Sequence, residues 1–414
     1  MQVAELDLGA DGEAVLGPGP GSGPVTSGAV FVLVRREGRP VGTMLGRVPE
    51  GADPVRALAD PARRLHPGPP PDAVAGPAAV SLRPPTAAVV VATRERAGQL
   101  ARALDSLLAQ DHPDFEIVVV DNAPVTGETR ELVERKYGER VRYVCEPVPG
   151  LAAAHNRGLA AVRSEVTAFT DDDVVADPRW LTELTTPFAA DPGLGCATGL
   201  ILPARLRTPA QVLLESHGGF AKGFTPRTYD PARPPADEPL FPFTAGRFGS
   251  GASMAFRTAA LRAAGGFDPA TGAGTHARGG DDLYGFVRIL AQGGRLHYTP
   301  AALVWHHHRE TWRDLETQAY GYGAGLTAYL TAVLVNRPAL LPAFLARLPR
   351  GLAHARGLTA VRDTDGGGAP GDHDERTHPW PRRLSRLQRR GMLYGPVGYL
   401  RARYAHRAAV RGTA

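Results

Sequence analysis

The run Val166-Thr167-Ala168-Phe169-Thr170-Asp171-Asp172-Asp173 decides the fold, because an apolar segment ends there in three consecutive carboxylates. Such a segment predicts a β-strand. Adjacent carboxylates repel one another, so a divalent cation that neutralises them would explain their placement. Oxygen ligands at a strand end suit Mg²⁺ or Mn²⁺. The alternative is a solvated acidic turn before the helix start at Asp177-Pro178.

Upstream of this run, strand-like and helical segments alternate. Strands are predicted over residues 87–92, 116–120 and 141–145, and helices over 99–110, 128–137 and 151–162. This spacing indicates right-handed βαβ units and a mostly parallel, Rossmann-like sheet with flanking helices. Ligands bind at the carboxyl ends of the strands in such sheets. The polar residues after each strand are therefore candidate site residues: Thr93 to Arg96, Asp121-Asn122 and Glu146.

Two further motifs lie in the second half of the chain. Gly279-Gly280-Asp281-Asp282 opens a predicted helix, where the helix dipole favours carboxylates. The functional alternative is a general base that takes a proton from an acceptor hydroxyl. In Val304-Trp305-His306-His307-His308, the first and third histidines share one face of a strand that follows a turn predicted at Thr299-Pro300. Either histidine would complete a metal site; zinc is the rival metal, although no His-Glu-x-x-His motif is present.

Composition adds few constraints. The 414 residues are 43% hydrophobic and 21% charged, which is typical of a globular protein. The net charge of +5 comes almost entirely from arginine; its simplest interpretation is a solvated basic surface, and attraction to anionic lipid or phosphate is the alternative. No nucleic-acid partner is expected, because no basic run interleaves with aromatics. Cys145 and Cys196 are expected to be buried thiols.

The cellular location is also predicted from the sequence. The first ten residues carry acids and lack an apolar core, so they do not indicate a signal peptide. The longest apolar stretch, residues 321–335, is too short to span a bilayer. These features predict a cytoplasmic protein, with peripheral contact to the inner face of a membrane as the extension.

The chain divides into three predicted regions. Residues 1–85 form a small N-terminal region with strands over 30–34 and 41–45, a helix over 54–65 and a proline-rich linker. Residues 86–309 form the α/β domain, with a long loop over 203–246. Residues 310–414 form a helical region with a helix over 310–335, a polar, mobile segment over 364–381 and a basic amphipathic stretch over 382–411. That last stretch is either a helix packed on the domain or a membrane-surface or partner helix.

The motifs, taken in order, resemble the family-2 glycosyltransferases of GT-A fold. The resemblance covers roughly residues 87–308 and rests on the residues already quoted together with Gly150 to Gly158, Gly249 to Met254 and Gly265 to Asp268. It implies an inverting enzyme with a bound divalent metal, Mn²⁺ or Mg²⁺. It also implies a nucleotide-diphosphate sugar donor, with UDP the first expectation. The acceptor would be a hydroxyl of a glycan, a lipid-linked sugar or a small molecule.

The resemblance also implies roles for single residues. Asp282 would be the catalytic base, and Asp173 the metal ligand, with His306, or else His308, as a second ligand. Asp281 stands where the family usually has Glu, and His155 where Arg is common, while the loop over 93–96 lacks the usual Pro and Asn. The residues that would contact the donor nucleotide or sugar are Thr93, Arg96, Asp121, Asn156 and Asp171.

Three rival functions follow from the same residues. A sugar-phosphate nucleotidyltransferase would need a glycine-rich loop after its first strand, but residues 93–98 contain one glycine. A metal-dependent nucleotide-sugar hydrolase would use the same carboxylates and histidines without an acceptor. A non-catalytic nucleotide-sugar binding protein would be expected to lack the Asp triplet or the Asp281-Asp282 pair, and both are present.

Overall fold

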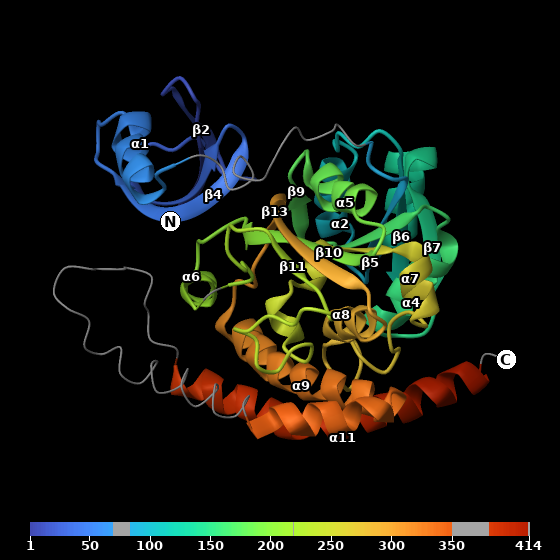
Figure 1. Ribbon diagram of the computed structural model, residues 1–414. Coiled ribbons are helices and arrows are strands. Elements are labelled where there is room, and N and C mark those ends of the chain that lie inside the picture. Colours follow the sequence, from blue (N-terminus) through green and yellow to red (C-terminus); the bar gives the residue numbers. More distant parts are fainter. Residues whose placement is uncertain (69–82, 218, 350–380, 413–414) are drawn as a thin grey trace.

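The computed structural model describes residues 1–68, 83–217, 219–349 and 381–412, and these form two β-sheets with flanking helices (Figure 1). The smaller sheet has the order β2-β1-β3-β4, with β1 parallel to β3. Its elements are β1 Gln2–Leu8, β2 Ala14–Pro18, β3 Gly28–Arg36, β4 Arg39–Val48 and the helix α1 Pro54–Leu65, which packs against the sheet. The predicted strands over 30–34 and 41–45 and the helix over 54–65 are confirmed.

Strands β1 and β2 were not predicted: Glu5 and Asp7 interrupt the apolar pattern of β1, and β2 is short and ends in Gly-Pro. In the structure these acids have specific partners. Glu5 accepts a hydrogen bond of 2.7 Å from Arg35, and Asp7 accepts one of 2.9 Å from the amide of Gly38. Their charges are therefore compatible with a strand whose alternate residues, such as Leu6, are buried.

The small sheet packs on the large one through an apolar contact and an ion pair. Val3 and Phe31 belong to the same buried cluster as Leu303 and Trp305 of the large sheet. Next to it, Arg35 lies 2.6 Å from Asp177.

The large sheet has nine strands in the order β11-β13-β10-β12-β8-β5-β6-β7, with β9 paired to β13. Its strands are β5 Ala87–Thr93, β6 Phe115–Asn122, β7 Arg142–Glu146, β8 Val166–Asp171, β9 Val174–Ala176, β10 Leu194–Pro203, β11 Arg227–Tyr229, β12 Met254–Arg257 and β13 Arg295–His306. The βαβ half, β7-β6-β5-β8, is parallel as predicted. Strand β12 then pairs antiparallel with both β8 and β10, so the whole sheet is mixed.

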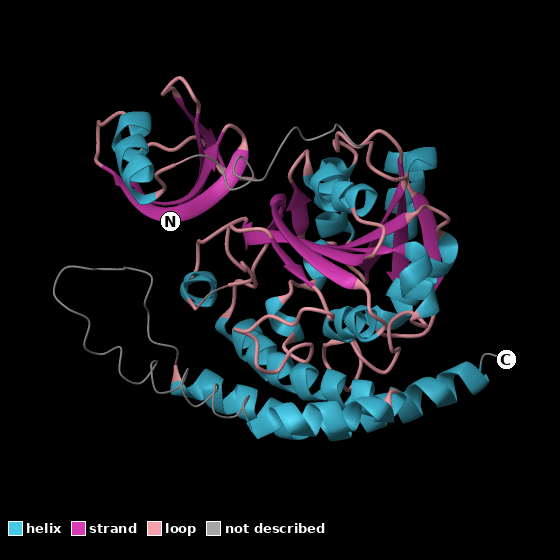
Figure 2. Cartoon of the chain, in the orientation of Figure 1, coloured by secondary structure: helices cyan, strands magenta, loops and turns pink. Residues whose placement is uncertain are grey.

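Helices cover both faces of this sheet (Figure 2). One face is covered by α2 Ala97–Leu107, by α3 Glu128–Leu132 with the helical turn that follows it, and by α5 Trp180–Ala190. The other face is covered by α4 Leu151–Ala161, α7 Thr258–Ala263 and α8 Asp281–Ala291. Every residue of β5 is buried between the two layers, which explains its continuous apolar sequence.

Two predictions in the second half need correction. The segment 203–246 is not only loop, because α6 Pro209–Ser216 lies within it. A capping box between Thr208 and Gln211 starts that helix, and this is a signal that the sequence carries. The turn expected at Thr299-Pro300 is instead a register shift inside the continuous strand β13. Proline has no amide hydrogen to donate, so the shift lets the strand continue past Pro300.

Two long helices form a further layer beyond α8 (Figure 1). They are α9 Trp312–Asn336 and α11 Arg382–Gly412, both at predicted positions. They run side by side and parallel, since Glu316 meets Arg383 near their starts and Thr327 meets Met392 further along. The polar segment predicted over 364–381 falls almost wholly outside the described residues.

Among the described residues, no single helix has the length and apolar composition to cross a membrane. The helices Trp312–Asn336 and Pro338–Pro349 pass that test only as a pair, and the chain bends by 110° between them.

Candidate active site

The carboxyl ends of the strands surround a pocket of about 480 Å³. Thr93 ends β5, Asn122 ends β6 and His306 ends β13. The Asp triplet stands at the end of β8. Helix α9 closes the pocket with Gln318 and Tyr322. Candidate residues that the sequence spreads over more than 200 positions are therefore neighbours in space.

A short strand brings the triplet to the histidines. Asp171 ends β8, Asp172 and Asp173 form the turn to β9, and β9 pairs antiparallel with the end of β13. In this register Val174 lies opposite His306, and the amide of His307 donates a 2.9 Å hydrogen bond to the carbonyl oxygen of Asp173. Backbone pairing thus fixes the distance between Asp173 and His306.

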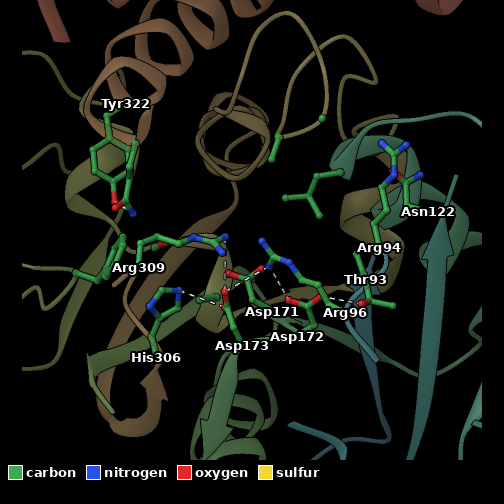
Figure 3. A pocket seen from close by; sticks show the side chains of 18 residues that line it. Thr93, Arg94, Arg96, Asn122, Asp171, Asp172, Asp173, His306, Arg309 and Tyr322 are labelled. Carbon is green, nitrogen blue, oxygen red and sulfur yellow. Dashed lines mark hydrogen bonds and ion pairs between the residues drawn. The ribbon is translucent and has the colours of Figure 1, made fainter. Parts of the chain in front are cut away.

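The three carboxylates have different surroundings. Asp173 lies 3.3 Å from His306 and 3.8 Å from Arg309, and these positive partners, which outweigh its burial, hold the pKa of Asp173 below its ordinary value. Burial and the charge of Asp173 raise the pKa of Asp171 to about 7. Figure 3 shows the triplet between His306 and Arg309 on one side and Thr93 and Arg96 on the other.

The middle carboxylate is held by the first loop. Asp172 accepts a 2.7 Å hydrogen bond from the hydroxyl of Thr93 and one of 3.1 Å from the guanidinium of Arg96. Arg96 also lies 3.5 Å from Asp173. The two predicted first-loop contacts therefore line the pocket and at the same time bind the triplet.

Asp171, Asp173 and His306 fit a divalent cation. Each offers one ligand atom, and these atoms all lie within 4.8 Å of one another. The buried Oδ1 atom of Asp173 makes no hydrogen bond of good geometry among the described residues, and it lies 3.3 Å from Nε2 of His306, so both atoms are placed to bind one cation. Two carboxylates and one imidazole suit Mn²⁺, and the carboxylate oxygens also suit Mg²⁺.

The third histidine lies behind this group. The Nδ1 atom of His308 is 3.0 Å from Nδ1 of His306, and its Nε2 atom is 3.2 Å from the carboxylate of Glu215. His308 therefore contacts His306 and not the carboxylates of the triplet, as a residue that orients a metal ligand would. The structure places His306, and not His308, in the group of three.

Asp282 lies beside the pocket wall at the start of α8. Its Oδ2 atom accepts a 3.0 Å hydrogen bond from the amide of Gly251, which stands between the lining residues Ser250 and Ala252. Burial and the neighbouring carboxylate of Asp281 raise the pKa of Asp282 to about 6. A carboxylate with a pKa near neutral pH suits proton transfer.

The other acid of the pair points away from the pocket. Asp281 is buried and lies 3.2 Å from His155, whose ring packs against those of Phe169 and Phe267 at centroid distances of 5.0 Å and 5.2 Å. His155 is 1% exposed and belongs to the core under the site. It therefore makes no pocket contact of the kind that the family's usual Arg implies.

Asp121 is buried beside the pocket and does not line it. It accepts a 2.9 Å hydrogen bond from the hydroxyl of Tyr143, its Oδ1 atom has no hydrogen-bond partner among the described residues, and burial raises its pKa. Its neighbour Asn122 lines the pocket and accepts a 2.9 Å hydrogen bond from the amide of Gly150.

Asn156, expected to contact the donor, lies outside the pocket lining and bonds to the backbone of a loop. Its amide nitrogen donates to the carbonyl oxygen of Phe267 at 2.8 Å, and its amide oxygen accepts from the Phe267 amide at 2.9 Å. Both ends of the side chain are thus occupied by the backbone. Asn156 holds the loop over 265–268 against α4 and is not among the pocket residues.

Several pocket residues were not predicted. Arg309 directly follows the histidine run, and that position was its one available signal. Phe220 lies in the irregular segment after α6, with its ring 5.1 Å from that of His306 and 6.4 Å from that of Tyr322. Neither Phe220 nor Tyr322 belongs to a recognisable motif, so only the fold brings them to the pocket.

Comparison with known proteins identifies the family. The model described as "Glycosyltransferase like family 2" matches residues 84–320, which is more than half of the chain. The chain belongs to this family. As a family-2 glycosyltransferase with this α/β sheet and these flanking helices, it has the GT-A fold that the motif order implied, with a helical C-terminal region.

Two curated relatives of this glycosyltransferase are named as glycosyltransferases. The pre-mycofactocin glycosyltransferase of Mycobacterium tuberculosis is 30% identical over 237 residues, which are 57% of this chain and 45% of that protein. The validoxylamine A glucosyltransferase of Streptomyces hygroscopicus subsp. jinggangensis is 35% identical over 125 residues, 28% of this chain and 29% of that protein. The chain thus spans less than half the length of these relatives.

Among solved structures, a mannosyltransferase from Pyrobaculum calidifontis in complex with GDP-Man and Mn²⁺ is similar to this chain. It is 20% identical with a TM-score of 0.48, over 79% of this chain and 91% of that one.

Proposed function

We propose that this glycosyltransferase is an inverting, metal-dependent enzyme that moves a sugar from a nucleoside-diphosphate donor to an acceptor hydroxyl. One observation carries the proposal: a group of metal-ligating atoms on Asp171, Asp173 and His306 lines the same pocket whose wall adjoins the Asp282 carboxylate. A metal site and a carboxylate of raised pKa are the two parts that such a reaction needs.

The metal end of the pocket would hold the diphosphate. Asp173 and His306 would bind Mn²⁺ or Mg²⁺, whose charge stabilises the leaving nucleoside diphosphate. Arg96 and Arg309 lie beside Asp173 at 3.5 Å and 3.8 Å. Guanidinium groups form bidentate hydrogen bonds with phosphate oxygens. When the nucleotide sugar binds, both arginines could therefore contact its diphosphate in place of the Asp173 carboxylate.

The proton would go to Asp282. Its ionised carboxylate would take the proton of the acceptor hydroxyl while that oxygen attacks the anomeric carbon. The bond from this carbon to the diphosphate oxygen breaks on the opposite face, so one displacement inverts the configuration. The hydrogen bonds from the amides of Gly251 and Leu283 hold the carboxylate in a fixed orientation before the reaction.

The nucleoside would lie over β5 and β6. Thr93, Arg94 and Asn122 line that side of the pocket. Next to Asn122 in β6, the buried Oδ1 atom of Asp121 has no hydrogen-bond partner among the described residues. We propose UDP as the first nucleotide to test. Asp171 would face the ribose or the donor sugar, since among the described residues it is the one acid of the triplet whose side chain makes no hydrogen bond or ion pair.

The acceptor would enter past two aromatic rings. Phe220 and Tyr322 line the pocket on the side of α9, and the side chain of Tyr322 is 41% exposed. Aromatic faces provide apolar surface for the C–H faces of a sugar ring. A glycan, a lipid-linked sugar or a small polyhydroxylated molecule would meet this requirement.

A transfer assay tests the proposal against its rivals. The protein is incubated with Mn²⁺ and radiolabelled UDP-, GDP- or dTDP-sugars, with and without a panel of hydroxyl acceptors. The proposal predicts acceptor-dependent release of the nucleoside diphosphate and a product of inverted anomeric configuration by NMR. Release at an equal rate without any acceptor would make the protein a hydrolase. Formation of pyrophosphate from a nucleoside triphosphate and a sugar phosphate would make it a nucleotidyltransferase, and binding without turnover would make it a binding protein.

A further inference from the structure

Helix α11 leaves an apolar stripe exposed on its outer face. Leu393, Val397, Leu400 and Tyr404 recur every three or four residues, so they lie on one side of the helix. Their exposed fractions are 82%, 48%, 57% and 79%. Figure 1 shows α11 at the edge of the molecule, on the side of α9 away from the large sheet. The stripe therefore faces away from the protein body.

Close packing on α9 fixes this orientation. A Cβ atom added to Gly391 would lie 2.1 Å from the carbonyl oxygen of Tyr320, and one added to Gly395 would lie 2.0 Å from the Thr327 hydroxyl. The same face of α11 buries Tyr399 completely. Because these contacts admit only glycine at the crossing, α11 cannot rotate to bury its outer stripe.

Arginines surround the stripe. Residues 382–412 contain nine arginines and no aspartate or glutamate. Arg383 pairs with Glu316, whereas no ion pair within the described residues involves Arg386, Arg389 or Arg390. These three exposed residues precede Leu393 by one or two helical turns. The outer face thus combines exposed apolar side chains with positive charge that has no carboxylate partner there.

A second pocket, of about 280 Å³, opens at the far end of the stripe. Arg403, His406 and Arg407 of α11 line one side, and Asp268 lines the other. The Oδ2 atom of Asp268 already accepts hydrogen bonds from Asn336 and from the hydroxyl of Tyr399. The unmatched charge of this pocket is therefore positive.

We propose that α11 docks the enzyme on the surface of an anionic phospholipid membrane. The apolar stripe would enter the boundary between headgroups and acyl chains, and the arginines would meet lipid phosphates. Its arginines keep α11 on the surface and not across the bilayer. A symmetric second copy would set the arginines around one stripe, Arg386, Arg389 and Arg390, against a second basic face. A nucleic acid would leave the apolar stripe without an apolar partner.

Vesicle flotation with the full chain tests this proposal. The probes are vesicles of phosphatidylcholine alone and vesicles with about 30% phosphatidylglycerol, at about 0.1 M and about 0.5 M salt. We expect at least tenfold stronger binding to the anionic vesicles, and most of that gain lost at the higher salt concentration. The assay needs no sugar donor, so its outcome is independent of the transfer reaction.

Matched variants separate the stripe from the charge. The stripe variant is Leu393→Ser, Leu400→Ser and Tyr404→Ser, and the charge variant is Arg386→Gln, Arg389→Gln and Arg390→Gln. The control variants alter exposed residues of the N-terminal region, Val15→Ser with Leu65→Ser, and Arg56→Gln with Arg64→Gln. Because all these side chains are exposed, each variant should melt within a few degrees of the parent protein.

The expected result is at least a tenfold loss of vesicle binding in the stripe and charge variants and no loss in the controls. Failure of the parent protein to float with anionic vesicles would overturn the proposal, as would a stripe variant that floats normally. Light scattering gives a further test. A parent protein that is dimeric and a stripe variant that is monomeric would also overturn the proposal, because a second copy would then cover the outer face of α11.

Discussion

Asp173 and His306 lie 3.3 Å apart, although 133 positions separate them in the sequence. The pairing of β9 with β13 produces this contact, and the amide of His307 bonds to the carbonyl of Asp173 within it. The contact joins the acidic strand end to the histidine run and completes a group of ligand atoms with Asp171. The predictions below follow from this geometry.

Replacing His306 should remove the metal dependence of nucleotide binding. His306→Ala takes away one of the three grouped ligands, so we expect at least a tenfold weaker effect of Mn²⁺ on nucleotide affinity, measured by titration calorimetry. His307→Ala is the matched control: it removes an adjacent imidazole that is not among the grouped ligands and keeps the backbone bond to Asp173. Equal metal dependence in both variants would contradict the assignment of His306.

Replacing Asp282 should stop transfer and leave donor binding intact. Asp282→Asn keeps the shape of the side chain and removes its ability to take a proton, so we expect turnover to fall by roughly 10²–10⁴. Calorimetry of the nucleotide with Mn²⁺ should give the parent affinity. Near-normal turnover in this variant would show that another group is the base.

The pH dependence of transfer should report the ionisation of Asp282. With a pKa of about 6, its basic form is lost as pH falls below that value, so the rate at saturating donor and Mn²⁺ should decline from pH 7 to pH 5. A flat rate over this range under saturation would argue against Asp282 as the base.

The same pKa predicts a difference in stability. Because folding raises the pKa of Asp282 above its ordinary value of about 4, its ionisation destabilises the folded state as pH rises from about 4 through 6. Asp282→Asn should therefore raise the melting temperature at pH 8, and the gain should shrink toward pH 4. A variant less stable than the parent at pH 8 would contradict the cause assigned to the shift.

The start of α8 should tolerate no side chain at Gly280. Its φ of +87° favours glycine, and a Cβ atom there would lie 2.5 Å from the carbonyl oxygen of Gly325 in α9. Gly280→Ala should lower the free energy of unfolding by about 1–3 kcal/mol and displace Asp282, which lowers kcat. Gly98→Ala, in α2 with nothing within 4 Å of the added atom, is the control and should melt at or above the parent temperature. Equal melting temperatures for the Gly280→Ala and Gly98→Ala variants would refute the proposed steric clash with Gly325.

Much of the fold was predictable because the parallel half of the sheet is built from local patterns. Continuous apolar runs identify β5 and β8, and helical periodicity identifies α2 and α4. The antiparallel insertion of β12, the pairing of β9 and the unbroken course of β13 past Pro300 depend on contacts between distant segments. Local patterns do not record such contacts.

In the candidate site, too, some residues belong to local sequence patterns and others are brought in only by the fold. The Asp triplet and His306 were predicted because unusual residues gather at strand ends. The motif position of Asn156 does not reveal that its amide bonds to the backbone of Phe267, because that contact depends on a loop more than 100 positions away. Tyr322 was missed because it reaches the pocket from a helix whose start lies outside the α/β pattern.

Thermal melting with nucleotides tests the central claim most directly. The purified chain is melted with UDP, GDP, dTDP or CDP, each with and without Mn²⁺, since ligands that bind the native state raise the melting temperature. The account predicts that one nucleotide stabilises the protein strongly, and only when Mn²⁺ is present. No stabilisation by any nucleotide in the presence of Mn²⁺ would contradict a metal-dependent nucleotide-sugar site at Asp171, Asp173 and His306.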